Sequence, residues 1–137
     1  MTSGAYGSTS GTNERESRPL MDRVMSFNVA DEIQSLRSES EWSENERNSR
    51  TLAKEVDFRV LLSVLHTDAT IDEQDGDARA SVHVLEGSAE LDVGGETTSL
   101  QEGELAVVDA GQSWVLRATS DCAVLITLAW PVEKAGV

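Results

Sequence analysis

Between residues 51 and 129 the sequence alternates apolar and polar residues in short segments, and this period of two is typical of β-strands. Turn residues such as Glu86-Gly87 and Ala110-Gly111 separate the segments about every eight to twelve positions. Closely spaced antiparallel strands of this kind suit a closed barrel or a jelly roll. The predicted strands are Thr51–Lys54, Phe58–Leu65, Ala80–Glu86, Ala89–Val93, Thr97–Leu100, Leu105–Val108, Trp114–Ala118 and Cys122–Ala129.

The pair Gly94-Gly95 lies between the segments AELDV and ETTSL. Both central residues of a tight hairpin turn require a positive φ, which glycine adopts at little cost. The pair therefore predicts a two-residue β-hairpin.

The region before the strands predicts one short helix. Asn28 can cap its first turn, and Val29, Ile33 and Leu36 recur on one helical face. The pattern ends near Ser38. A chain of 137 residues has room for one hydrophobic core. We expect a disordered tail at residues 1–25, a single domain at residues 26–131 and a short tail at residues 132–137.

The net charge of −14 argues against two classes of partner. An acidic field repels the phosphates of nucleic acids and of anionic membrane surfaces. The sequence has no apolar run of about 18 residues and no secretory signal, so we expect a cytoplasmic protein. Cys122 lies in the apolar run CAVLITLAW, where a thiol behaves as a small buried hydrophobic group.

Four motifs along the predicted strands resemble those of the small single-domain cupins, of the RmlC-like superfamily. The motifs are VHVLEG (Val82–Gly87), VGGE (Val93–Glu96), LQEGELAVV (Leu100–Val108) and DAG (Asp109–Gly111). The resemblance covers roughly residues 26–131. It implies an all-β fold, the cupin-type double-stranded β-helix or jelly-roll barrel, with one short N-terminal helix. It does not by itself imply a chemistry, because one fold carries many functions.

The metal-binding cupins carry a histidine pair, a glutamate and a further histidine, and these positions fall here on Gln74, Gly76, Ala80 and Trp114. First-row divalent metals need several imidazole, carboxylate or thiolate ligands that converge on one point. We therefore expect no metal and no cofactor at this position. The resemblance places Trp114 in the barrel, either as a plug or as the wall of a pocket that includes Gln74 and Leu116.

The two histidines are weak candidates for catalysis. His83 lies three residues past Ala80, so strict alternation places it on the opposite face of the sheet from the usual ligand position. His66 follows a predicted strand and is interpreted as a solvent-exposed turn residue. An enzymatic site would require carboxylates from Glu73, Asp75 or Asp77 to converge with His83.

Three hypotheses follow from the sequence. The favoured one is a metal-free binding or sensing module for a small organic molecule, which we expect to form a homodimer, as small cupins commonly do. The second is a metal-dependent cupin enzyme, a dioxygenase or an isomerase, with a rearranged site. The third is a structural or interaction protein whose barrel is filled by its own side chains.

Overall fold

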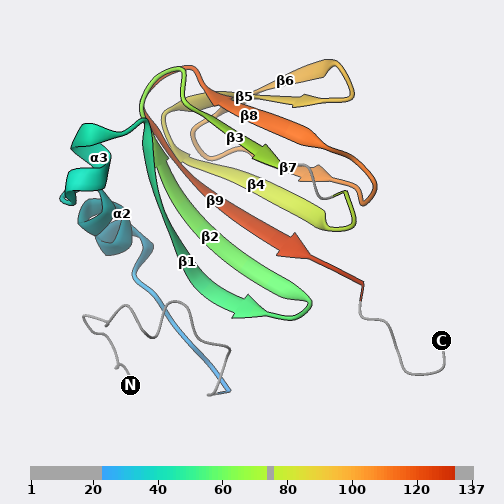
Figure 1. Cartoon of the computed structure of the whole chain (residues 1–137), viewed down its shortest axis with the longest axis horizontal. Helices are drawn as coiled ribbons and strands as arrows, with labels where there is room; N and C mark the ends of the chain where they lie inside the picture. Colours follow the sequence, from blue (N-terminus) through green and yellow to red (C-terminus); the bar gives the residue numbers. More distant parts are fainter. Residues whose placement is uncertain (1–22, 74–75, 132–137) are drawn as a thin grey trace.

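The computed structural model describes residues 23–73 and 76–131, and within these ranges two helices precede nine strands (Figure 1). The tails predicted at the two ends lie outside the described residues, apart from residues 23–25. The helices are α2 (Val29–Arg37) and α3 (Ser40–Glu44). The strands are β1 (Arg47–Glu55), β2 (Phe58–Leu65), β3 (Thr70–Glu73), β4 (Arg79–Glu86), β5 (Ser88–Val93), β6 (Glu96–Gln101), β7 (Leu105–Val108), β8 (Trp114–Ala118) and β9 (Cys122–Ala129).

The strands form two antiparallel sheets that lie against each other (Figure 1). The larger sheet has the order β1-β2-β9-β4-β7 and the smaller sheet has the order β3-β8-β5-β6. Apart from the consecutive pairs β1/β2 and β5/β6, neighbouring strands in each sheet come from distant parts of the chain, so the chain crosses repeatedly between the two sheets. This arrangement confirms the predicted cupin-type jelly roll.

The main hydrophobic core lies between the two sheets, as alternation along the strands requires. In β4, for example, Val82 and Val84 are fully buried whereas the intervening His83 is not. The largest fully buried side chains of this core are Leu65, Leu116, Val82, Val84, Val124 and Cys122.

A second, smaller cluster covers the outer face of the larger sheet. The helix α2 contributes Ile33 and Leu36 to it, and these side chains pack on Leu62 and Val64 of β2. The predicted cap of this helix is confirmed, because the side-chain oxygen of Asn28 accepts a hydrogen bond from a backbone N–H in the first turn at 3.0 Å. Neither described helix is long and apolar enough to cross a bilayer.

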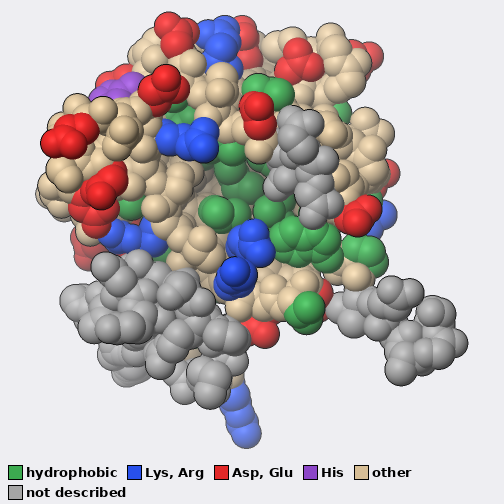
Figure 2. Space-filling view, in the orientation of Figure 1, with side chains coloured by type: hydrophobic (Ala, Val, Ile, Leu, Met, Phe, Trp, Pro, Cys, Tyr) green, Lys and Arg blue, Asp and Glu red, His purple; other side chains and the backbone are tan. Residues whose placement is uncertain are grey.

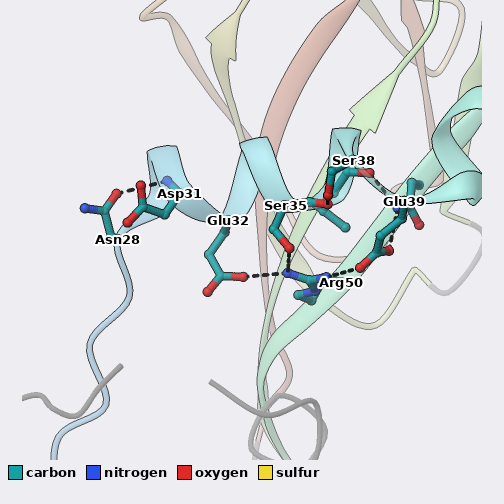
Figure 3. Close-up of polar contacts among 9 residues, drawn as sticks. Asn28, Asp31, Glu32, Ser35, Ser38, Glu39 and Arg50 are labelled. Atoms are coloured by element: carbon teal, nitrogen blue, oxygen red, sulfur yellow. Dashed lines mark hydrogen bonds and ion pairs between the residues drawn. The ribbon is translucent and has the colours of Figure 1, made fainter. Parts of the chain in front are cut away.

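Arg50 of β1 fastens both helical segments to the sheet (Figure 3). Its Nη1 lies 2.8 Å from Glu32 Oε1, and its Nη2 lies 2.6 Å from Glu39 Oε2. The side chain of Arg50 is only 10% exposed, so these charge-assisted contacts are partly shielded from water. They join the N-terminal segment to the sheet beside the apolar contacts of the outer cluster.

The Gly-Gly hairpin between β5 and β6 is confirmed. Gly94 and Gly95 have φ values of 60° and 86°, and the side-chain oxygen of Asp92 accepts a hydrogen bond from Gly95 N at 3.1 Å. Both glycines have open space where a Cβ would stand, so the turn needs them for backbone conformation alone.

The structure adds three features that the sequence did not predict. Strand β1 begins at Arg47 rather than Thr51, β3 was not predicted, and α3 forms around Trp42. The first half of β1 reads RNSR and β3 reads TIDE, and neither has the apolar alternation of a half-buried strand. Both are edge strands, each paired with a neighbour on one side only.

Candidate functional site

A cavity of about 290 Å³ opens where the edge strand β1 of the larger sheet faces the edge strand β3 of the smaller one. It reaches inward from this opening to the core between the sheets. On this face of the molecule, hydrophobic side chains gather in a hollow with basic side chains beside them (Figure 2). The residues that line the cavity are Arg47, Ser49, Arg59, Leu61, Ser63, Ile71, Asp72, Trp114, Ile126 and Leu128.

Strand register explains why these side chains meet. In the larger sheet Ser49 is opposite Ser63, and Arg59 is opposite Leu128. Directly opposed residues point to the same face of a sheet, so both pairs face inward. The hydroxyl groups of Ser49 and Ser63 form a hydrogen bond. The polar residues at positions 59 and 63 of β2 therefore lie on the same face as the core residue Leu65.

The deep wall of the cavity is apolar. Trp114 is 3% exposed and Ile126 and Leu128 are also 3% exposed, so all three are part of the packed core as well as of the wall. Leu61 and Ile71 complete this wall and are partly buried. An apolar wall with a few polar groups at its rim is the usual composition of a small-molecule pocket.

Arg59 lies at the inner side of the cavity with an unsatisfied donor. Its Nε is buried and has no hydrogen-bond partner, and its guanidinium carbon lies 5.2 Å from the ring centroid of Trp130. A buried donor without a partner costs roughly 1–3 kcal/mol of folding stability, more if it is charged. The contact with the Trp130 ring offsets part of that cost.

Arg47 closes the outer edge of the cavity. Its Nη1 donates a hydrogen bond to the backbone carbonyl of Thr70, which ties β1 to the start of β3. Among the described residues, neither Arg47 nor Arg59 forms an ion pair with a carboxylate. Four other arginines do form such pairs: Arg37, Arg50, Arg79 and Arg117.

The three residues that the sequence placed in a pocket have different positions. Trp114 lines the cavity. Leu116 is fully buried and packs in the core rather than at the cavity surface, so its contact with a ligand stays a prediction. Gln74 lies outside the described residues. Arg47 and Arg59 were not predicted to be site residues, although Arg59 and Ser63 are the two polar residues of the segment FRVLLSVL and share one strand face.

Two of the positions that the resemblance assigns to metal ligands, Ala80 and Trp114, hold core side chains. Ala80 and Trp114 are both 3% exposed and pack in the core. His83 is in register with Leu105 and Leu125, and Leu125 packs with the outer cluster, which confirms that His83 faces away from the barrel interior. Within residues 23–73 and 76–131, no three His, Cys, Asp or Glu side chains are grouped to hold a metal ion.

The interpretation of His66 as a solvent-exposed turn residue is confirmed in part, because His66 follows β2 in a loop and its side chain is 37% exposed, but its ring also has partners on the protein. Its ring stacks on Trp42 with a centroid distance of 3.5 Å, and its Nε2 lies 2.7 Å from the Trp42 carbonyl oxygen. The unpredicted helix α3 brings Trp42 to this place, where it also packs against the outer cluster. His66 therefore has a structural role on the outside of the barrel, away from the cavity.

Cys122 is buried, as the sequence predicted. Burial raises the pKa of the Cys122 thiol to about 11, with a smaller contribution from the nearby carboxylate of Asp121. The nucleophilic form of cysteine is the thiolate, and this thiol is protonated at neutral pH. Cys122 thus serves as a packing residue of the core.

A second hollow of about 360 Å³ lies on the outside of the larger sheet. It is lined mainly by apolar side chains of the N-terminal segment and of β1 and β2, among them Val24, Phe27 and Phe58. Phe58 is 39% exposed and Val24 is 77% exposed, so this hollow is open to solvent. The cavity between the sheets has the larger share of polar groups and is the stronger candidate for a specific site.

Comparisons with known proteins agree with this architecture. The family model described as the AraC-binding-like domain matches residues 25–131. A search of curated proteins found no match.

Several solved structures share the fold. A conserved protein of unknown function from Streptococcus pyogenes is 26% identical, with a TM-score of 0.61, and the match covers 66% of this chain and 79% of that one. KdgF from Halomonas sp. is 18% identical, with a TM-score of 0.57 and coverage of 65% and 84%. The cupin domain of an XRE family transcriptional regulator from Enterobacter cloacae is 15% identical, with a TM-score of 0.58 and coverage of 64% and 100%. At identities this low, the last two show the fold alone.

Proposed function

The chain belongs to the AraC-binding-like domain family, whose jelly roll is of the cupin type, and from this premise we propose that it is a binding module for a small organic molecule. The observation that carries the proposal is the cavity of about 290 Å³ between β1 and β3, with Trp114 in its wall. Its volume is at the lower end of the range for small-molecule sites, so the ligand must be small.

The composition of the cavity supports binding rather than catalysis. Among the described side chains that line it are two arginines, two serines and one aspartate, but no histidine and no cysteine. The residues at the cupin metal positions Ala80 and Trp114 offer no ligand atoms, and Gly76 has no side chain at all. We therefore propose that binding in this cavity is independent of a metal. Cytoplasmic location stays a prediction from the sequence.

Filling the cavity should abolish binding without unfolding the protein. Ser49 lines the cavity from the exposed edge strand β1, so a phenyl ring in Ser49→Phe can occupy the cavity without disturbing the deep core. We expect small organic compounds found in a ligand-observed NMR screen with the wild-type protein to bind this variant at least tenfold more weakly. Ser99→Phe is the matched control, because Ser99 is exposed on β6 and far from the cavity lining.

Two results of this screen would contradict the proposal. One is that no compound of a fragment library binds the wild-type protein. The other is a set of bound compounds whose affinities are the same for Ser49→Phe, Ser99→Phe and wild type, because such compounds would bind elsewhere.

We also propose that two copies of the chain associate through β7. This strand is an edge of the larger sheet, and it exposes Leu105 and Val107 by 57% and 71% on the outer face. An edge strand with exposed apolar side chains invites pairing with another strand, and a two-fold axis would bury both patches at once.

Light scattering coupled to size exclusion tests the dimer. We expect a wild-type mass near twice the chain mass of 14.8 kDa, and a monomer for Val107→Glu, because two like charges would then meet across the axis. Val56→Glu is the control, since Val56 is 91% exposed in the turn between β1 and β2. A wild-type monomer at micromolar concentration, or a Val107→Glu variant that remains a dimer, would show the assignment of this surface to be wrong.

A further inference from the structure

We infer that the ligand of the cavity is a small organic anion, whose carboxylate pairs with Arg59 while its apolar part lies against Trp114. This inference rests on the proposed function and adds the chemical class of the ligand. Three observations carry it: an unsatisfied buried donor, the lack of an ion pair between Arg59 and any carboxylate of the described residues, and the division of the cavity into a polar and an apolar side.

The first observation concerns Arg59 Nε, which is buried and has no hydrogen-bond partner in the protein. Buried polar atoms in native proteins almost always have partners, and an exception requires an explanation. Arg59 lines the cavity, so a ligand there can supply an acceptor to its guanidinium group. The guanidinium group presents donors in a planar fork that matches a carboxylate, which makes an oxyanion the best acceptor for it.

The second observation is the charge pattern of the molecule. The chain has a net charge of −14, with 25 acidic against 11 basic side chains, so carboxylates are abundant on its surface. Arg59 and Arg47 nevertheless form no ion pair with any described carboxylate. Arg47 instead donates a hydrogen bond to the backbone carbonyl of Thr70. The described lining of the cavity has two cations and one carboxylate, Asp72, so it is a locally positive site on a chain whose net charge repels anions.

Asp72 is the acidic residue of the cavity lining, and it modifies the expectation. It lies on the edge strand β3 and is exposed, so water screens its charge more strongly than that of the partly buried Arg59. Asp72 should weaken anion binding slightly and should exclude dianions more than monoanions. The structure therefore favours a monocarboxylate.

The third observation is the apolar wall. Trp114, Ile126 and Leu128 are each 3% exposed and form the deep side of the cavity. Leu128 is directly opposite Arg59 in the sheet, so the cationic and apolar parts of the site lie side by side. A ligand that fits both parts has a charged group at one end and a short aliphatic or aromatic body at the other.

Matched acids and amides test the inference, because each pair has nearly the same shape and differs in charge. The probes are phenylacetate with phenylacetamide and 4-methylpentanoate with 4-methylpentanamide, with affinities measured by calorimetry or NMR titration. We expect each acid to bind the wild-type protein at least tenfold more tightly than its amide. In Arg59→Gln this preference should fall to about one, whereas Arg79→Gln, an exposed arginine outside the cavity lining, should retain it.

A second readout needs no ligand. If Arg59 is held unpaired for a ligand, then Arg59→Met removes an unsatisfied donor and keeps the apolar stem, so the melting temperature of the unliganded variant should equal or exceed that of the wild type. A variant that melts several degrees lower would assign Arg59 a structural role through its contact with Trp130 and would overturn the inference.

The outcomes separate this inference from the proposed function. If neutral compounds bind the wild type but not Ser49→Phe, and acids show no preference over amides, the binding module stands and the anionic ligand is wrong. If no acid, amide or neutral compound binds, both are wrong. An acid preference that survives in Arg59→Gln would place the anion elsewhere and would also overturn the inference.

Discussion

Replacement of Gly87 by alanine is expected to lower the free energy of unfolding by roughly 2–5 kcal/mol, which is a large part of the stability of a domain of this size. Gly87 has a φ of 81°, and a Cβ placed there would lie 2.3 Å from the carbonyl oxygen of Asp121 and 2.9 Å from Cys122 Cβ. The left-handed backbone costs an alanine about 1–2 kcal/mol. The overlap with rigid backbone costs about 1–3 kcal/mol more, because the chain between β8 and β9 must move.

Gly103→Ala separates the two costs. Gly103 has a φ of 88°, close to that of Gly87, but a Cβ there would meet nothing within 4 Å. We expect this variant to lose about 1–2 kcal/mol, the cost of the backbone conformation alone. Urea unfolding followed by circular dichroism measures both variants. If both variants lose the same free energy of unfolding, the close approach of the β4–β5 turn to the start of β9 adds nothing to the cost of Gly87→Ala.

Truncation of Trp114 to alanine is expected to lower the free energy of unfolding by about 3–5 kcal/mol, because it removes a large core side chain and enlarges the cavity beside it. The indole is 3% exposed and belongs to the core cluster between the sheets, although one side of it lines the cavity. Trp114 is in register with Val93 of β5, so its loss also weakens the packing of the smaller sheet.

Trp114→Phe is the companion variant, since a phenyl ring keeps most of the packing. We expect it to lose less than half as much stability as the alanine variant and to weaken ligand affinity by a measurable factor. Unfolding is best followed by circular dichroism, because both variants remove a fluorophore. A loss below about 1 kcal/mol for Trp114→Ala would mean that the indole contributes little to the core.

The side chain of Trp114 is both a plug of the core and a wall of the cavity. From the sequence, a plug and a pocket wall are alternative roles for Trp114. In the structure the indole is packed as deeply as a plug and still forms part of the cavity surface. The edge strands β1 and β3 supply Arg47, Ser49 and Asp72 to the rim of this cavity.

The sequence by itself determined the strands of the core and therefore the fold. Segments such as Phe58–Leu65 and Cys122–Ala129 match the structure residue for residue, because alternation and turn glycines are local signals. The face of His83 was also predictable, since parity along one strand needs no knowledge of its neighbours.

Only the tertiary structure decided the composition of the candidate site. Arg59 was within a predicted strand, but the sequence does not say which face of β2 lies inward, and Arg47 was outside any predicted strand. The physical reason is that β1 and β3 are edge strands: their pairing partners hold them in an extended form, and their polar side chains give no periodic apolar signal. A binding site that lies between two sheet edges depends on contacts between segments that are distant in sequence, and these contacts exist only when both sheets have formed.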